Sequence, residues 1–110
     1  MNNPLPARLR SARKAAKLTQ QQLGILLGMD LNTASARMNQ YEKGRHAPDF
    51  PTAKRLAEEL GVPVAYLFCE EELLADLICK IAKLSKAEQA RLLKSLSGAD
   101  CSPTADQREG

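Results

Sequence analysis

Apolar residues recur at steps of three and four along most of residues 5–96, the spacing that gathers them on one face of an α-helix. In residues 5–17, Leu9, Ala12 and Ala16 share such a face, and Pro6 is acceptable in the opening turn of a helix. The basic side chains of this segment then lie mostly on the outer face: Arg8, Arg10, Lys14 and Lys17. The pattern predicts a first helix with a buried apolar face and a solvated basic one.

A second helix is predicted directly after Leu18. Thr19 can cap its start, because a hydroxyl can accept a hydrogen bond from a free backbone N–H of the first helical turn. Three leucines then fall on one face: Leu23, Leu26 and Leu27. Gly28 marks the end, where helices commonly stop at a left-handed residue. Gly24 costs this helix about 1 kcal/mol relative to alanine, so we expect another helix to approach closely there.

A third helix follows after a short turn. Its apolar residues again step by three and four and form one stripe: Leu31, Ala34, Met38 and Tyr41. The run ends at Gly44. Residues 19–45 therefore form a helix, a short turn and a second helix, and the functional prediction rests on this stretch.

Two more helices are predicted before residue 69. Asp49 can cap the first of them, with Pro51 in its opening turn, and Gly61 can close it. Its buried stripe is expected to contain five residues: Phe50, Ala53, Leu56, Ala57 and Leu60. A short helix then starts at Val62 and Pro63 and closes the core with four residues: Val64, Tyr66, Leu67 and Phe68.

The chain continues with a predicted helical extension over residues 70–97. Three glutamates at residues 70–72 favour a helix start, because negative charge is stabilising near a helix N-terminus. The helix carries an apolar seam about two heptads long: Leu74, Leu77, Ile81 and Leu84. We expect this seam to form a homodimer interface, and the alternative is a helix folded back on its own domain.

A last helix is predicted at the end of the extension. Ser85 and Glu88 match the capping-box pattern that starts a helix. Three leucines follow at helical spacing: Leu92, Leu93 and Leu96. Residues 98–110 are polar and are predicted to be disordered.

Length and composition restrict the class of protein. The 110 residues suffice for one small domain with an appended element. No apolar run approaches the roughly 20 residues that span a bilayer, so we expect a cytoplasmic protein. Cys69, Cys79 and Cys101 lack a metal-binding spacing, and there is one histidine. We therefore expect no metal, no cofactor and no catalytic site.

The net charge of +3 is distributed unevenly. Residues 1–55 contain ten Lys and Arg against three acidic residues, whereas residues 56–110 contain six against ten. A basic front and an acidic back predict an anion-binding face on the N-terminal half. Phosphate is the natural partner of such a face.

The outer face of the predicted third helix points to a more specific partner. It presents short polar or small side chains, one arginine and no acid: Ser35, Ala36, Arg37, Asn39 and Gln40. Such side chains suit base-pair edges, because Asn and Gln can pair bidentately with adenine and Arg with guanine. We therefore predict that these five residues read bases in double-stranded DNA.

These features resemble the lambda-repressor/Cro-type (Xre-like) helix-turn-helix family over about residues 5–68. The resemblance rests on short motifs spread through that range: Arg8-Leu9-Arg10, Leu18-Thr19-Gln20, Gln22-Leu23-Gly24, Leu27-Gly28, Tyr41-Glu42-Lys43-Gly44, Pro48 and Leu56-Ala57-Glu58-Glu59-Leu60-Gly61-Val62. It implies an all-α fold, with a five-helix DNA-binding domain followed here by the C-terminal helical extension. Gly24 departs from the family pattern, which prefers alanine at this position.

The resemblance also implies roles for single residues. Arg13 and Glu42 would form a buried ion pair that ties the first helix to the end of the recognition helix. DNA phosphates would be bound at the start of the second helix and just beyond the recognition helix, by Thr19, Gln20, Lys43 and Arg45.

The turn before the recognition helix is a second departure, because the segment before Tyr41 has about four more residues than the family usually has. In one interpretation, Asp30 caps a recognition helix that is one turn longer, which the position of Leu31 in the apolar stripe favours. In the other, the turn is a longer loop, and Asn32 or Thr33 caps the helix.

The leading hypothesis is a sequence-specific transcriptional regulator that reads a palindrome in the major groove as a homodimer. The sequence does not separate a repressor from an activator. The alternative is an antitoxin-like protein whose C-terminal region neutralises a partner protein and whose DNA binding serves autoregulation. An enzyme is the least favoured class, because the sequence contains no glycine-rich phosphate loop and no metal-ligand spacing.

Overall fold

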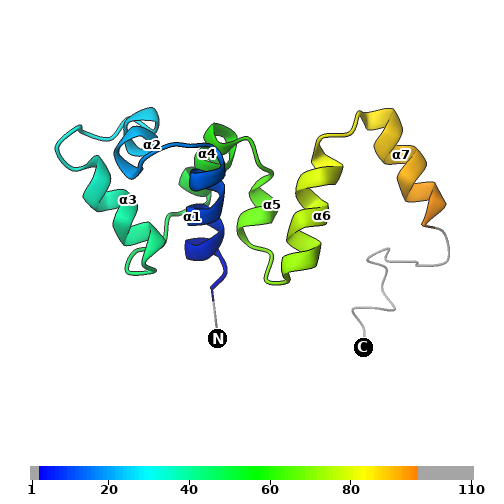
Figure 1. Cartoon of the computed structure of the whole chain (residues 1–110), viewed down its shortest axis with the longest axis horizontal. Coiled ribbons are helices and arrows are strands. Elements are labelled where there is room, and N and C mark those ends of the chain that lie inside the picture. Colours follow the sequence, from blue (N-terminus) through cyan, green and yellow to red (C-terminus); the bar gives the residue numbers. More distant parts are fainter. Residues whose placement is uncertain (1–2, 97–110) are drawn as a thin grey trace.

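The computed structural model describes residues 3–96, and all regular secondary structure in that range is helical (Figure 1). Seven helices follow one another within it: α1 (Leu5–Ala15), α2 (Gln20–Leu26), α3 (Ala34–Glu42), α4 (Phe50–Leu60), α5 (Val64–Leu67), α6 (Glu72–Ala82) and α7 (Lys86–Ser95). The predicted all-α fold is confirmed. Residue 97 of the predicted extension and the predicted disordered segment 98–110 lie outside the described residues.

The first five helices enclose one hydrophobic core. Five large side chains in it are shielded from solvent almost completely: Leu9, Leu23, Met38, Leu56 and Leu67. Each of these side chains comes from a different one of the helices α1 to α5. Burying a Leu or Met side chain contributes about 1.5–3 kcal/mol, so each helix is held in place by what it adds to this common core.

Most helix starts and stops follow the predicted caps. Thr19 Oγ1 accepts a hydrogen bond from the backbone N–H of Gln22 at 3.0 Å, and Gln22 Oε1 accepts one from the backbone N–H of Thr19 at 2.8 Å. Asp49 accepts a hydrogen bond from the backbone N–H of Thr52 at 3.0 Å. Hydrogen bonding from the Thr52 hydroxyl and backbone lowers the pKa of the Asp49 carboxyl. Gly61 ends α4 in the left-handed conformation, with a φ of 71°.

The recognition helix α3 begins later than the favoured interpretation predicts. Asp30 does not cap an extra helical turn: its side chain accepts a hydrogen bond from the backbone N–H of Asn32 at 2.9 Å, which forms a local turn. The helix starts at Ala34, and Thr33 occupies the capping position without a capping hydrogen bond from its side chain. Leu31 consequently lies in the turn and is 58% exposed, so its assignment to the buried stripe is wrong.

Several predicted inward-facing residues near helix ends are exposed. Ala16 lies beyond the end of α1, where the chain turns through Lys17 with a φ of 62°. The side chains of Leu26, Phe50 and Phe68 are 47%, 59% and 48% exposed. Leu26 and Phe50 are terminal residues of α2 and α4, and Phe68 follows α5. At such positions no second helix covers the side chain, although the periodic spacing continues.

Arg8 is buried, contrary to the prediction of an outward basic residue, and is only 7% exposed. Its Nε and Nη2 donate to the carbonyl oxygens of Cys69 at 2.9 Å and Glu70 at 3.2 Å. Its Nη1 lies 3.1 Å from a carboxylate oxygen of Glu72, and its guanidinium carbon is 5.6 Å from the ring centroid of Tyr66. Because these groups take up its donors, the guanidinium can be buried. It ties α1 to the loop between α5 and α6.

Helix α6 packs against the core with one face only. Ala75 is fully buried, and Ile78 and Cys79 are packed against the core cluster. Burial raises the pKa of the Cys79 thiol. Three leucines of the same helix are exposed: Leu73, Leu74 and Leu77. The helix therefore folds back on its own domain along one side and leaves part of the predicted seam open to solvent.

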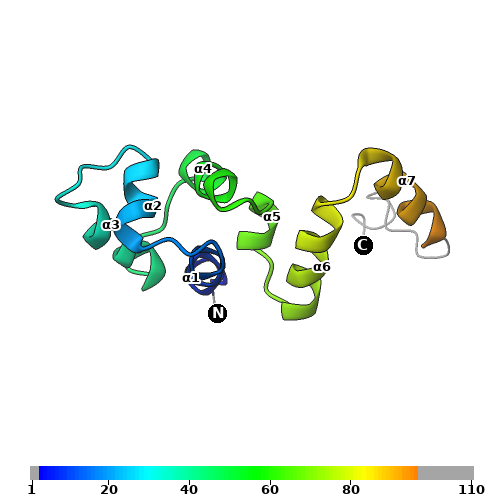
Figure 2. The same cartoon turned by 45° about the horizontal axis from the view of Figure 1, so that its top comes forward.

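Helix α7 extends the row of helices away from the core, as Figures 1 and 2 show from two directions. It begins with the predicted capping box, in which Ser85 Oγ accepts a hydrogen bond from the backbone N–H of Glu88 at 3.1 Å. None of its residues is buried. The radius of gyration is 16.5 Å, whereas a compact domain of 100 residues has about 13 Å. We call residues 5–67 the head and residues 72–95 the arm.

Candidate nucleic-acid interface

Helices α2 and α3 meet at the glycine that the sequence singles out. A β-carbon placed on Gly24 would lie 2.7 Å from the β-carbon of Ala34, closer than two carbon atoms can pack. The expected close approach of another helix is confirmed, and that helix is α3. The contact sets the distance and angle at which α3 is presented to solvent.

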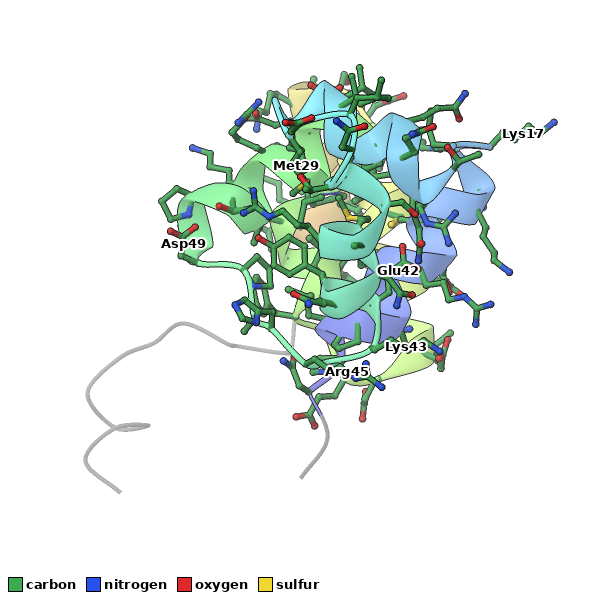
Figure 3. The ribbon with its side chains drawn as sticks, turned by 90° about the vertical axis from the view of Figure 1, so that its left-hand side faces the viewer. Lys17, Met29, Glu42, Lys43, Arg45 and Asp49 are labelled. Atoms are coloured by element: carbon green, nitrogen blue, oxygen red, sulfur yellow. The ribbon has the colours of Figure 1, made fainter. Side chains whose placement is uncertain are left out.

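The outer face of α3 lies at the end of the molecule opposite to the arm (Figure 1), and Figure 3 views the head from that end. The helix buries Ala34, Met38 and Tyr41. The predicted base-reading residues lie off this stripe: Ser35, Ala36, Arg37 and Gln40 are exposed and Asn39 is half-buried. The structure therefore places all five at or beside one solvent-facing side of α3.

Arg13 and Glu42 are in direct contact across α1 and α3. The Nε and Nη2 atoms of Arg13 lie 2.5 Å and 3.0 Å from the two carboxylate oxygens of Glu42, a bidentate arrangement. Arg13 Nη1 also donates to the carbonyl oxygen of Leu18 at 2.9 Å. The side chains of Arg13 and Glu42 are 11% and 3% exposed. The pair thus fixes the last turn of α3 against α1 and the turn that leads into α2.

Gln20 connects this ion pair to the outer face of α3. Its Nε2 donates to Glu42 Oε1 and to Asn39 Oδ1, both at 3.1 Å. Its Oε1 lies 3.4 Å from the hydroxyl oxygen of Ser35. Gln20 is predicted to bind a phosphate, but its side-chain amide is turned toward protein groups. A phosphate contact from this residue would therefore use its backbone N–H.

The predicted phosphate-binding cations lie at the end of α3. Lys43 and Arg45 directly follow the helix and are exposed, and Figure 3 shows both beyond its last turn. Thr19 is also exposed, at the start of α2, although its hydroxyl oxygen already serves as the helix cap. The cations and the start of α2 thus border the outer face of α3.

Two arginines that were not predicted to be functional have roles in this part of the structure: Arg10 borders the site and Arg55 supports α2. Arg10 lines a notch of about 160 Å³ together with five residues: Arg13, Gln20, Asn39, Glu42 and Lys43. Its place three residues before Arg13, on the same side of α1, is the signal that could have identified it. Arg55 has a structural role, because its Nη1 donates to the carbonyl oxygen of Leu27 at the end of α2 at 3.0 Å.

Within residues 3–96, no three His, Cys, Asp or Glu side chains lie close enough together to hold a metal ion. None of the helices in this part of the chain is long and apolar enough to cross a membrane.

A helical head in which α2 and α3 meet closely and α3 presents a polar, acid-free face defines a helix-turn-helix DNA-binding domain. The family model for Helix-turn-helix matches residues 9–67. The chain is also similar to the crystal structure of transcriptional regulator BswR, with 46% sequence identity and a TM-score of 0.81 over 86% of this chain and 94% of that one. A comparison with curated proteins found no match. The chain belongs to the lambda-repressor-like (Xre) helix-turn-helix family of DNA-binding transcriptional regulators, which are generally not enzymes.

Proposed function

We propose that this chain is a sequence-specific regulator that reads the DNA major groove with the outer face of α3 and binds its operator as a homodimer. The observation that carries the proposal is the position of that face. It lies at the end of the molecule opposite to the arm (Figures 1 and 3), so the described residues leave it open to a duplex.

The dimensions and side chains of α3 support a groove contact. Its nine residues span about 14 Å at 1.5 Å per residue, and the major groove of about 12 Å admits an α-helix. Ser35 and Ala36 lie in the N-terminal half of the helix, the part that reaches base edges in helix-turn-helix proteins. Arg37 and Gln40 add two long exposed side chains, which can donate to guanine and pair with adenine.

Phosphate contacts would come from the groups around α3. Lys43 and Arg45 supply two exposed cations beyond its last turn, and Arg10 supplies a third across the notch. Thr19 and Gln20 supply polar groups at the start of α2. Such contacts fix the register of the protein on DNA but carry little sequence information.

The homodimer proposal rests on the apolar surface of the arm. Leu74 and Leu77 of the predicted seam are 47% and 46% exposed, while Ile81 and Leu84 are half-buried. Leu73 adds to this surface with 74% exposure. Residues 70–96 contain five acidic and five basic side chains, so no net charge opposes the pairing of two arms. A contiguous apolar surface of this kind typically marks an interaction site.

The antitoxin-like alternative competes for the same surface, because a partner protein could cover the arm in place of a second copy. The observation that favours it is the exposure of Leu93 on α7 and of Leu96 directly after that helix, since both are apolar residues outside the predicted seam. The oligomeric state of the isolated protein separates the two readings. A stable homodimer supports self-pairing, whereas a monomer that co-purifies with a second protein supports the alternative.

The proposal is tested by selecting bound duplexes from a random pool and measuring their affinity by fluorescence anisotropy. We expect a palindromic consensus with half-sites about 10–10.5 base pairs apart or a multiple of that. Arg37→Ala and Gln40→Ala should each lose roughly 1–3 kcal/mol of discrimination at one base position. Lys43→Ala is the matched control, because loss of a phosphate contact should weaken all sequences alike and reduce the salt dependence. If no sequence is enriched among the bound duplexes, the proposal is wrong.

A further inference from the structure

The ion pair between Arg13 and Glu42 determines how the side-chain amide of Gln20 is oriented. Both carboxylate oxygens of Glu42 already accept hydrogen bonds from Arg13, whose guanidinium only donates. Any further neighbour of Glu42 Oε1 must therefore present a donor. Gln20 does so with its amide nitrogen Nε2 at 3.1 Å, and its amide oxygen must point the other way. The chemistry of Glu42 thus determines which end of the Gln20 amide faces inward.

The Gln20 amide in turn orients the side chain of Asn39. The second proton of Gln20 Nε2 goes to Asn39 at 3.1 Å, so the Asn39 atom in that contact must be its acceptor, Oδ1. The amide oxygen of Asn39 is thereby turned toward Gln20. Its Nδ2 group has no hydrogen-bond partner among residues 3–96. Asn39 is half-buried and sits one position before the exposed Gln40, at the edge of the outer face of α3.

We infer that Asn39 reads DNA as a donor only, and that Gln20 is the positioning residue that makes it so. A free asparagine pairs with adenine through both its amide oxygen and its amide nitrogen. An amide oxygen has two lone pairs, but with Oδ1 turned toward Gln20 the end of the Asn39 amide that is left for a base edge is its nitrogen, which only donates. In the major groove, guanine presents two acceptors, N7 and O6, whereas adenine presents one acceptor beside a donor. At its contact position this protein therefore prefers guanine over adenine.

This preference differs from the one that residue type alone suggests, because the sequence analysis pairs Asn39 with adenine. The contact between Ser35 and Gln20 at 3.4 Å is longer than an ordinary hydroxyl hydrogen bond. It is therefore a weak restraint on the Ser35 hydroxyl. The constraint thus acts on Asn39 and leaves Ser35 adaptable.

The inference rests on the proposed groove contact, and the experiment separates the two. The operator selected by the parent protein is resynthesised with each base replaced in turn, and affinities are compared with those of Asn39→Ala. We expect one position at which the parent favours guanine over adenine by about fivefold or more and Asn39→Ala does not. Replacing that guanine by 7-deazaguanine, which lacks the N7 acceptor, should weaken the parent and leave Asn39→Ala unchanged.

Gln20→Leu tests the positioning role directly. It frees Oδ1 of Asn39, so the ratio of the affinity for adenine to the affinity for guanine at that one position should rise by about fivefold. The discrimination that depends on Gln40 should stay unchanged. In the Gln20→Leu/Asn39→Ala double variant the gain should disappear. If Gln20→Leu does not fold, the 7-deazaguanine comparison with the parent still decides the base preference.

Three results would overturn the inference. One is adenine in the parent consensus at the position that depends on Asn39. Another is an unchanged preference in a folded Gln20→Leu variant. The last is a uniform loss in Asn39→Ala across all sequences, which would assign Asn39 to a phosphate while the groove contact of α3 stands. A parent protein without any sequence preference would instead remove the proposed function itself.

Discussion

Ala34 occupies the space that any side chain at Gly24 would need. A β-carbon on Gly24 would lie 2.7 Å from Ala34 Cβ and 3.1 Å from both its Cα and its carbonyl oxygen. Two of these three atoms belong to the backbone of α3, so the clash cannot be relieved by turning a side chain. Ala34 is the first residue of α3 and is fully buried. The glycine in α2 and the first residue of α3 therefore meet in one close contact.

Gly24→Ala should destabilise the head, although alanine is the better helix former. Moving α3 outward to make room is an overpacking change that typically costs about 1–3 kcal/mol, which outweighs the gain of about 1 kcal/mol in helix propensity. Urea unfolding would measure the net loss. In an Ala34→Gly background the same substitution should cost less, because the β-carbon at 2.7 Å is gone. Equal losses in both backgrounds would contradict the contact.

Glu42→Ala should be more damaging, because it leaves Arg13 largely buried without its partner. Removing one member of such a pair costs about 3–5 kcal/mol. Glu42→Gln is the matched control, since it keeps an acceptor near Arg13 and Gln20 but loses the charge, and its loss should be smaller. The unfolding free energies of both variants, determined in urea, test this order. A loss of less than about 1 kcal/mol for Glu42→Ala would mean that the pair behaves as an exposed one.

Arg8 should stabilise the molecule through carbonyl groups more than through its acidic neighbour. Glu72 is 85% exposed in its side chain, so its ion pair with Arg8 is screened by solvent and contributes under about 1 kcal/mol. The two hydrogen bonds to backbone carbonyls are sheltered. We expect Arg8→Lys to lose about 1–3 kcal/mol, because an ammonium cannot reproduce the planar fork. The thermal stability of Glu72→Ala should change little. An equal loss of stability in Arg8→Lys and Glu72→Ala would contradict the view that the carbonyl hydrogen bonds contribute more than the ion pair.

Lys17 adopts a left-handed backbone conformation, with a φ of 62°, in the turn between α1 and α2. That conformation destabilises a residue with a β-carbon by about 1 kcal/mol or more. Because Lys17 is exposed, packing of its side chain does little to offset this cost. Lys17→Gly should therefore raise the unfolding free energy by about 1 kcal/mol. Lys17→Ala removes the same charge but keeps the β-carbon, and it should give no such gain in the same urea titration.

Helix boundaries were predictable where the determinants lie within four residues of one another. The hydroxyl of Thr19 and the carboxylate of Asp49 each meet a backbone N–H three residues later. The left-handed conformation of Gly61 depends on that residue alone, because glycine has no β-carbon. Such local rules act before any tertiary contact forms, so the sequence is sufficient to place these caps.

Burial at helix ends and within the polar network depends on tertiary structure. Leu31 fits a periodic stripe but lies in a turn where no helix covers it. Arg8 looks like a surface residue until α5 and α6 bring two carbonyl oxygens to it. The Gln20 amide is oriented by groups from α1 and α3 together. None of these outcomes follows from residue type or spacing along one helix.

The arm is the part of the molecule to which the homodimer proposal applies. Helix α6 contacts the head through Ala75, Ile78 and Cys79. Leu74 and Leu77 remain nearly half exposed on a different side of the same helix. A helix that only covered its own domain would have no reason to be apolar on that second side. Pairing of two arms would shield it from solvent.

Charging the seam should therefore separate dimerisation from folding. Leu77→Glu with Ile81→Lys is expected to give a folded monomer that binds the palindromic operator weakly and an isolated half-site almost normally. Asp76→Lys with Lys83→Glu is the control, because it also puts one lysine and one glutamate on the arm without changing its net charge, but at exposed positions outside the seam, and it should stay dimeric. Sedimentation equilibrium and anisotropy on both DNA lengths measure the outcome. A monomeric parent would exclude pairing through the arm, and unfolding of the seam variant alone would assign those side chains to the core of their own domain.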